Sequence, residues 1–293
     1  MRAPAIPAKA AAGTLRLVPS ESLALRSATV ASSWTAQPVA LGLDQPLALL
    51  GGRPDDVRRI RHDLRDGWRT AAAGLFEEVA IQAGRPDIGW FRMPPLLLSG
   101  CNGAGRTHFA RRTAQAAGVP HVMLDLTGKS SVSQSRRGIE PMFPSLPVIA
   151  MAVSRCANPV VTVLNAAALE PRVQQELAWM IDEATAARCS EEAIGGFVDL
   201  SHVSWIFQTK VGDALSPFLA RKLRPVHLEW PDTPDLMLHL VEIMAEAVLD
   251  EDVAQLGGRE IAETLEAMRE AAGRRSTAEL YRIACRMVRS SLE

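Results

Sequence analysis

Five short apolar runs in the middle of the chain constrain its fold more than any other feature of the sequence. They cover residues 95–99, 121–126, 159–164, 203–208 and 226–230, and each is bounded by glycine, proline or polar residues. Longer stretches with helical character separate them. Continuous apolar strands that alternate with helices are typical of a parallel sheet buried on both faces. The sequence therefore predicts an α/β domain, a parallel sheet sandwiched by helices, over about residues 50–232.

Different patterns flank this domain. Residues 1–48 are rich in Ala, Ser and Pro, and we expect them to form a loosely ordered arm. After residue 232 no strand signal follows, and three apolar stripes at helical spacing predict helices. These stripes are Leu236, Leu240 and Ile243; Ile261, Leu265 and Met268; and Leu280, Ile283, Ala284 and Met287. The predicted organisation is an arm over 1–48, an α/β core over 49–232 and a small all-α lid over 233–293.

Composition narrows the class of protein. Hydrophobic residues make up 47% of the 293 residues and charged residues 22%, as in an ordinary globular chain. The formal net charge of -1 argues against a strongly basic nucleic-acid-binding protein. The apolar runs are too short to cross a membrane, and the four cysteines lack the spacing of a zinc site or a redox pair. We expect a cytoplasmic protein with no membrane partner.

The first apolar run leads into a glycine-rich loop that ends at a predicted helix. Residues 100–107 read GCNGAGRT, which is the phosphate-loop pattern G-x-x-x-x-G-K-[ST] with Arg106 at the lysine position. The backbone N–H groups of such a loop and the dipole of the following helix form a cradle for phosphate. Arg106 keeps the positive charge, although its guanidinium is planar and not compact. The Thr107 hydroxyl is a candidate ligand of Mg²⁺.

The pattern predicts ATP or ADP with Mg²⁺ as the ligand of this loop. The alternative is a glycine turn that only caps a helix. The residues expected to contact the nucleotide are Gly100, Asn102, Gly103, Ala104, Gly105, Arg106 and Thr107.

Together with four later segments, the loop resembles the AAA+ ATPases, and most closely the ATPase part of the Lon family. The segments are 135–138 (SRRG), 158–165 (NPVVTVLN), 198–206 (VDLSHVSWI) and 214–221 (ALSPFLAR), in the order of that family's motifs. The resemblance implies a P-loop NTPase-like (AAA+) core of five parallel strands with a helical lid. It also implies nucleotide between the loop and the lid, with adenine near residues 50–60. It does not extend to the Lon protease domain, so peptidase activity is not expected.

Several positions depart from the family's catalytic pattern. The Walker B pair, Asp-Glu in active members, is Asn165 and Ala166 here, so the charge of the magnesium shell and the water-polarising group are both missing. The sensor-1 Asn falls on Lys210, the sensor-2 Arg on Ala278 and the aromatic pore residue on Ile139. Loss of a positioned base typically costs about 10²–10⁴ in rate. These departures predict weak or absent hydrolysis.

An arginine is retained at the arginine-finger position. This residue is Arg221, and Arg224 is the weaker alternative. In this family the finger acts on the nucleotide of a neighbouring subunit. The resemblance therefore implies a homo-oligomer or an assembly with an AAA+ paralogue.

Three functions stay open at this point. The first, which we adopt, is a degenerate AAA+ protein that binds ATP or ADP weakly or not at all and acts as a regulatory or scaffold subunit. The second is a slow but active ATP-hydrolysing ring protein, which needs an acidic residue from elsewhere near the cradle. The third is a protein- or DNA-binding module with a vestigial loop, suggested by the arginines of residues 58–69. Interspersed aspartates offset that charge, so we do not expect nucleic-acid binding.

Overall fold

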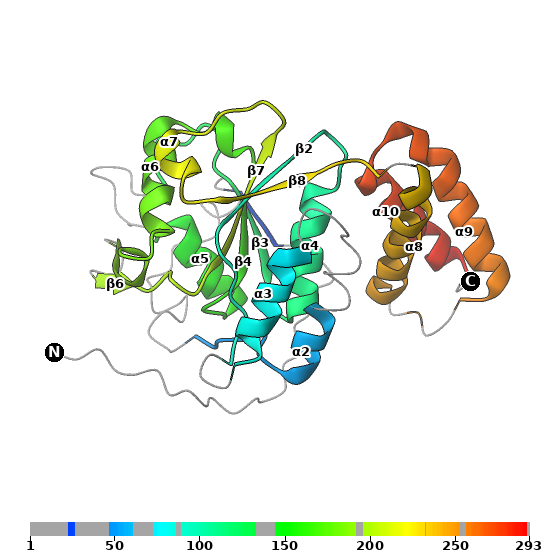
Figure 1. The fold of residues 1–293 in the computed structure, drawn as a ribbon, viewed down its shortest axis with the longest axis horizontal. Coiled ribbons are helices and arrows are strands. Elements are labelled where there is room, and N and C mark those ends of the chain that lie inside the picture. Colours follow the sequence, from blue (N-terminus) through cyan, green and yellow to red (C-terminus); the bar gives the residue numbers. More distant parts are fainter. Residues whose placement is uncertain are drawn as a thin grey trace.

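The protein forms an α/β core followed by a bundle of three helices (Figure 1). The computed structural model describes residues 23–26, 47–60, 73–85, 89–132, 144–191, 196–231, 233–251, 253 and 256–291. Residues 135–138 and Ile139, which carry part of the resemblance, lie outside these ranges. The apolar spacing of Val57, Ile60, Leu64 and Trp68 predicts a first helix, and Leu64 and Trp68 also lie outside these ranges.

The five expected strands are present, and all their pairings are parallel. They are β2 (Leu96–Gly100), β3 (His121–Asp125), β4 (Val160–Val163), β7 (Ser204–Lys210) and β8 (Arg224–Leu228). A sixth strand, β1 (Leu23–Arg26), pairs in parallel with β3, and the sheet order is β1-β3-β4-β7-β2-β8. Within residues 1–48, which we expect to form an arm, Leu23–Arg26 thus pairs with the open edge of β3, which offers hydrogen-bonding partners to an extended segment.

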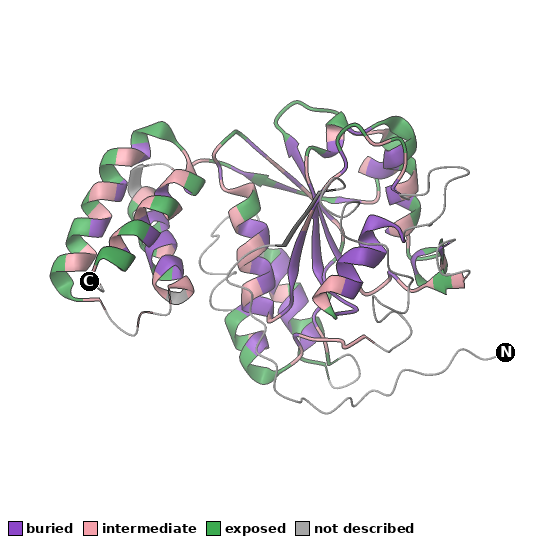
Figure 2. Ribbon diagram, turned by 180° about the vertical axis from the view of Figure 1, so that it is seen from behind, coloured by how far each residue is buried: buried purple, intermediate pink, exposed green. Residues whose placement is uncertain are grey.

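Helices cover both faces of the sheet (Figures 1 and 2). One face carries α2 (Pro54–Arg59), α3 (Ala73–Ala83) and α4 (Arg106–Ala117). The other carries α5 (Leu146–Ser154), α6 (Pro171–Met180) and α7 (Pro217–Ala220). Along β7, Ile206 packs on the α4 side, whereas Trp205 and Phe207 pack on the α6 side with ring centroids 6.1 Å apart. Each face is thus a separate apolar core, as the continuous apolar strands predict.

A short antiparallel pair lies outside the main sheet. It consists of β5 (Cys189–Glu191) and β6 (Gly196–Val198), and a 3₁₀ turn at Ala186–Arg188 precedes it. The sequence pattern does not predict this pair, because strands of three residues leave no recognisable period.

The C-terminal part is helical, as expected. It contains α8 (Thr233–Asp250), α9 (Gly258–Ala271), a 3₁₀ turn at Ala272–Arg274 and α10 (Thr277–Ser290). The three helices enclose their own core, which includes Leu240, Ile243 and Met268 from the expected stripes. Figure 1 shows this lid beside α4. Within the described residues, no helix has the length and apolarity needed to span a membrane.

Candidate functional site

The glycine loop joins the carboxyl end of β2 to the first turn of α4. Gly103 and Gly105 adopt left-handed φ angles of 89° and 88°, a conformation that side chains with a Cβ rarely tolerate. Gly105 is the N-cap residue of α4 and, as a glycine, offers no side chain to bind the free N–H groups of the first turn. The loop therefore has the tight path and the available helix N-terminus that an anion cradle needs.

The loop lies at the carboxyl ends of β2 and β7, and we call the region above these strand ends the crevice. From β2 the chain passes through α4 on one face of the sheet to β3, and from β7 it passes through α7 on the other face to β8. Connections that leave neighbouring strands on opposite faces open a crevice at the carboxyl ends of those strands, where ligands of α/β proteins bind. Gly100 and Lys210 are register partners there, so Lys210, the sensor-1 position, lies directly beside the loop with its side chain exposed.

Arg106 is held against this crevice by backbone carbonyls. Its Nη1 donates to the carbonyl oxygen of Gly100 at 2.9 Å and to that of Thr209. Burial lowers the pKa of the guanidinium from its ordinary value, while Cys101 and Asp213 oppose that shift. The side chain remains a cation because an arginine pKa starts above 12. Arg106 thus places a fixed positive charge at the end of the loop.

Gln208 of β7 meets Thr107 from across the crevice. The Thr107 hydroxyl donates to Gln208 Oε1 at 3.4 Å. Gln208 is only 6% exposed, and its Nε2 has no hydrogen-bond partner among the described residues. This residue could not be singled out from the sequence, because a lone glutamine in a strand matches no catalytic or binding pattern.

The end of β4 contains no acidic group. Asn165 follows the strand with a left-handed φ of 50° and is exposed, and Ala166 is fully buried in the core against α6. The acidic residue that the structure brings toward the loop is Asp213, which follows β7. It accepts a hydrogen bond from the Lys210 amide at 3.4 Å and interacts electrostatically with Arg106. Asp213, like Gln208, is not among the residues predicted from the sequence.

These residues do not fit a bound magnesium ion. Mg²⁺ prefers hard oxygen ligands, usually with one or two carboxylates. The Thr107 hydroxyl faces a neutral amide, and Asp213 is engaged with a cation and a backbone amide. No group of three or more His, Cys, Asp or Glu side chains suited to a metal occurs within the described ranges. The expected role of Thr107 as a metal ligand therefore finds no support in this geometry.

The lid contacts the glycine loop directly. The backbone N–H of Thr277 donates to the carbonyl oxygen of Gly103 at 3.0 Å, and the Thr277 hydroxyl donates to the same oxygen at 2.9 Å. A Cβ atom at Gly103 would overlap the carbonyl oxygen of Arg275, and one at Gly105 would lie 3.0 Å from Thr277 Oγ1. Ala278, where the resemblance expects the sensor-2 Arg, is exposed in the first turn of α10 and brings no charge to the loop. The first turn of α10 thus requires both loop glycines to lack side chains.

A buried ionic cluster joins α4 to the lid. The carboxylate of Glu246, fully buried on α8, lies 3.0 Å from His108 Nε2 and 2.5 Å from Arg111 Nη2. Burial raises the pKa of Glu246, but His108 and Arg111 outweigh it and hold the pKa below its ordinary value. Arg111 also contacts Asp250 at 2.7 Å and lies over the ring of Tyr281 at 4.3 Å. Since buried charges are costly unless paired, this cluster fixes the lid against α4.

The arginine-finger candidates lie away from the loop of their own chain. Arg221 follows α7, is exposed, and lies over the Phe218 ring at 5.2 Å. Arg224 forms an ion pair with Glu78 of α3 at 2.7 Å. Arg221 is therefore accessible to another molecule, whereas Arg224 is engaged within the chain.

The packing of residues 50–60 lends no support to the expected position of adenine beside them. A Cβ atom at Gly51 would overlap the carbonyl oxygen of Ala117, and Arg59 Nε donates to the carbonyl oxygen of Ala116 at 3.3 Å. This segment thus packs on the C-terminal end of α4, while the glycine loop leads into its N-terminal end. A helix of 12 residues is about 18 Å long. Sequence order does not show which end of a helix an earlier segment covers.

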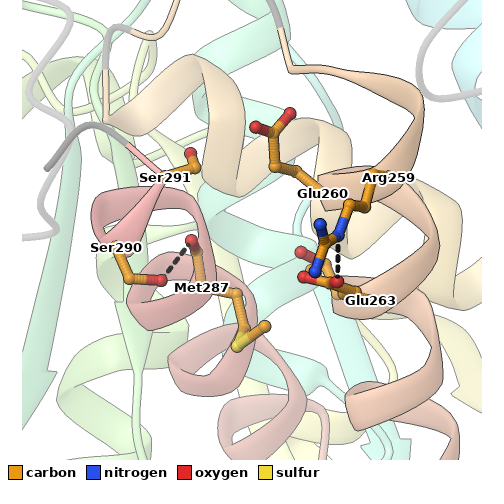
Figure 3. A pocket seen from close by; sticks show the side chains of 7 residues that line it. Arg259, Glu260, Glu263, Met287, Ser290 and Ser291 are labelled. Carbon is orange, nitrogen blue, oxygen red and sulfur yellow. Dashed lines mark hydrogen bonds and ion pairs between the residues drawn. The ribbon is translucent and has the colours of Figure 1, made fainter.

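A depression lies between α9 and α10 at the far end of the lid from Thr277 (Figure 3). Its polar groups are engaged with one another: Arg259 pairs with Glu263 at 2.7 Å, and the Ser290 hydroxyl donates to the carbonyl oxygen of Met287 at 2.8 Å. Nothing in this arrangement points to a ligand.

Comparisons with protein-family models and with curated protein sequences find no match for this chain. Its function must therefore be argued from the geometry of the crevice between β2 and β7.

Proposed function

We propose that this chain is a degenerate AAA+-type module that binds ATP or ADP at the glycine loop, hydrolyses it slowly or not at all, and acts as a regulatory or scaffold subunit in the cytoplasm. The observation that carries the proposal is the loop itself. Gly103 and Gly105 take left-handed conformations at the carboxyl end of a central parallel strand, and a long helix begins there. This is the arrangement in which backbone N–H groups and a helix dipole bind phosphate.

The groups around the loop disfavour rapid hydrolysis. Asn165 and Ala166 supply no base, and Lys210 supplies a cation where an amide would orient water. Cations support the binding of phosphate, but they do not accept a proton from an attacking water. A site with these residues therefore loses more of its ability to hydrolyse ATP than of its ability to bind it.

Calorimetric titration of the full chain with ATP and ADP, together with a phosphate-release assay, tests the proposal. We expect saturable binding with little turnover. Arg106→Ala should weaken ATP binding by about tenfold, which corresponds to about 1.4 kcal/mol. Arg58→Ala removes an exposed arginine that pairs with Asp55 and should leave binding unchanged. Absence of binding would overturn the nucleotide assignment, and rapid phosphate release would overturn the loss of hydrolysis.

A slow ATPase is the second candidate, and Asp213 is the observation that favours it. Burial lowers the pKa of Arg106, and this carboxylate lies close enough to oppose that shift, so an acidic group does approach the loop. If Asp213 supports hydrolysis, the Asp213→Asn variant will lose its residual phosphate release while still binding ATP.

The exposed position of Arg221 supports an assembly with a second copy or with an AAA+ paralogue. Light scattering of the full chain with and without ATP measures this, and Arg221→Ala should lower the stoichiometry. The nucleic-acid alternative gains no support from the described part of the basic stretch, because Arg58 and Arg59 pair with Asp55 and Asp56.

A further inference from the structure

We propose that the glycine loop binds its polyphosphate without magnesium, with the side-chain amide of Gln208 and the cations beside the loop in the place of the metal. The inference rests on the proposed nucleotide binding and adds the form in which the nucleotide is bound. It follows from the misfit between the residues of the crevice and a magnesium ion.

Gln208 is the central residue of this proposal. Its side chain is more than nine-tenths buried, and its Oε1 lies 3.4 Å from the hydroxyl of Thr107, in the first turn of α4. Its Nε2 is buried without an acceptor among the described residues. A buried donor that makes no hydrogen bond costs about 1–3 kcal/mol. A phosphate oxygen at the N-terminus of α4 would accept that hydrogen bond and remove the cost.

The same amide opposes a metal at this position. Magnesium requires oxygen ligands in near-octahedral geometry, and an –NH₂ group presents positive hydrogen atoms to any ion beside it. The Thr107 hydroxyl is directed to Gln208, and the carboxylate of Walker B is replaced by Asn165. The crevice therefore presents donors where a magnesium site would present acceptors.

Two cationic side chains take the place of Mg²⁺ in balancing the negative charge of the phosphates. Arg106 is fixed by Gly100 and Thr209, with Nη1 as the donor in both contacts, and Lys210 is the register partner of Gly100. Both residues therefore lie beside the first residue of the loop. Metal-free ATP carries more negative charge than its magnesium complex, so a pair of cations beside the loop favours the metal-free form.

Calorimetric titrations of the full chain with ATP, ADP and pyrophosphate, each in EDTA and again in excess Mg²⁺, test the proposal. We expect ATP to bind in EDTA at least as tightly as in Mg²⁺, and pyrophosphate to compete with it. Binding that requires Mg²⁺ would overturn this inference and leave the nucleotide assignment intact. That outcome would also indicate that the amide presents its oxygen, and not its nitrogen, to the ligand. Absence of binding in both buffers would overturn the inference together with the proposed function.

Two substitutions at Gln208 sharpen the test. Gln208→Glu places a carboxylate beside Thr107, and we expect it to weaken binding in EDTA at least tenfold while Mg²⁺ restores part of the loss. Gln208→Leu removes the donor and should weaken binding in both buffers. Gln82→Glu, at an exposed position of α3, introduces the same charge away from the crevice and should leave both affinities unchanged. Equal affinities for Gln208→Glu and the unsubstituted chain in EDTA would overturn the role of the amide.

Discussion

At Gly103 the chain has room for a hydrogen atom and nothing larger. The left-handed φ of 89° and the contact with the Arg275 carbonyl both exclude a side chain. We predict that Gly103→Ala lowers the free energy of unfolding by at least about 2 kcal/mol, as measured by urea denaturation. Gly128→Ala is the matched control, because Gly128 has a φ of 73° but a methyl group there would meet no atom within 4 Å. It should cost only about 1–2 kcal/mol of backbone strain, and an equal loss for both variants would contradict the role assigned to the lid contact.

The lowered pKa values of two buried histidines predict that the protein loses stability in mild acid. Burial lowers the pKa of His121 from 6.5 to about 3 and that of His239 from 6.5 to about 4. Below pH 6.5 the unfolded chain binds protons at these rings while the folded chain does not. The free energy of unfolding should therefore fall from pH 6.5 toward pH 4, by up to about 1.4 kcal/mol per pH unit for each histidine.

Urea denaturation at pH 7.5, 6.0 and 5.0 measures this slope. His121→Asn should reduce it, whereas His227→Asn, at an exposed position of β8, should not. A stability that stays constant from pH 7.5 to pH 5.0 would contradict the prediction.

At the residue scale, the sequence predicted the loop but not its surroundings. The glycine spacing identifies residues 100–107 because only glycine adopts the required φ angles cheaply. Gln208 in β7 and Asp213 just after that strand approach the loop from more than 100 positions away. Neither belongs to a motif, so only the pairing of β2 with β7 reveals that they lie beside the loop.

At the scale of the elements, α4 connects the glycine loop to the lid. The main buried partner of α4 in the lid is Glu246 of α8. We predict that Glu246→Gln lowers the free energy of unfolding by about 3 kcal/mol, because it leaves His108 and Arg111 facing a neutral group. Glu266→Gln breaks an exposed pair with Arg269 and should cost less than about 1 kcal/mol. Chemical denaturation of both variants measures the difference, and similar losses would argue against the ionic cluster.

The elements that the sequence predicted share one property. The five strands of the core are continuous apolar runs and the three lid helices carry apolar stripes at helical spacing, and their burial follows from these patterns. The strand β1 and the pair β5–β6 form by backbone pairing with other segments. The sequence contains no apolar pattern that would predict such pairing. The docking of the lid depends on charges at spacings of three and four along α4 and α8, which also suit a solvated helix face.

For the whole molecule, the contacts between the lid and the α/β core predict one cooperative unfolding transition. The Thr277–Gly103 hydrogen bonds and the ionic cluster join the lid to the core at two places. ATP in EDTA at about 100 times its Kd should add about 2.7 kcal/mol to the stability and raise Tm by several degrees. Calorimetry measures both effects, and a separate low-temperature transition of the lid would contradict the coupling.

The carbonyl oxygen of Gly103 accepts hydrogen bonds from both the backbone N–H and the hydroxyl of Thr277. A single oxygen atom therefore carries both of these bonds between the glycine loop and the lid. Movement of the lid away from the loop would break both bonds, because both donors belong to one residue. Separation of the lid from the loop would expose the amide proton of Thr277 to solvent, so its rate of deuterium uptake reports the equilibrium between the docked and the separated lid.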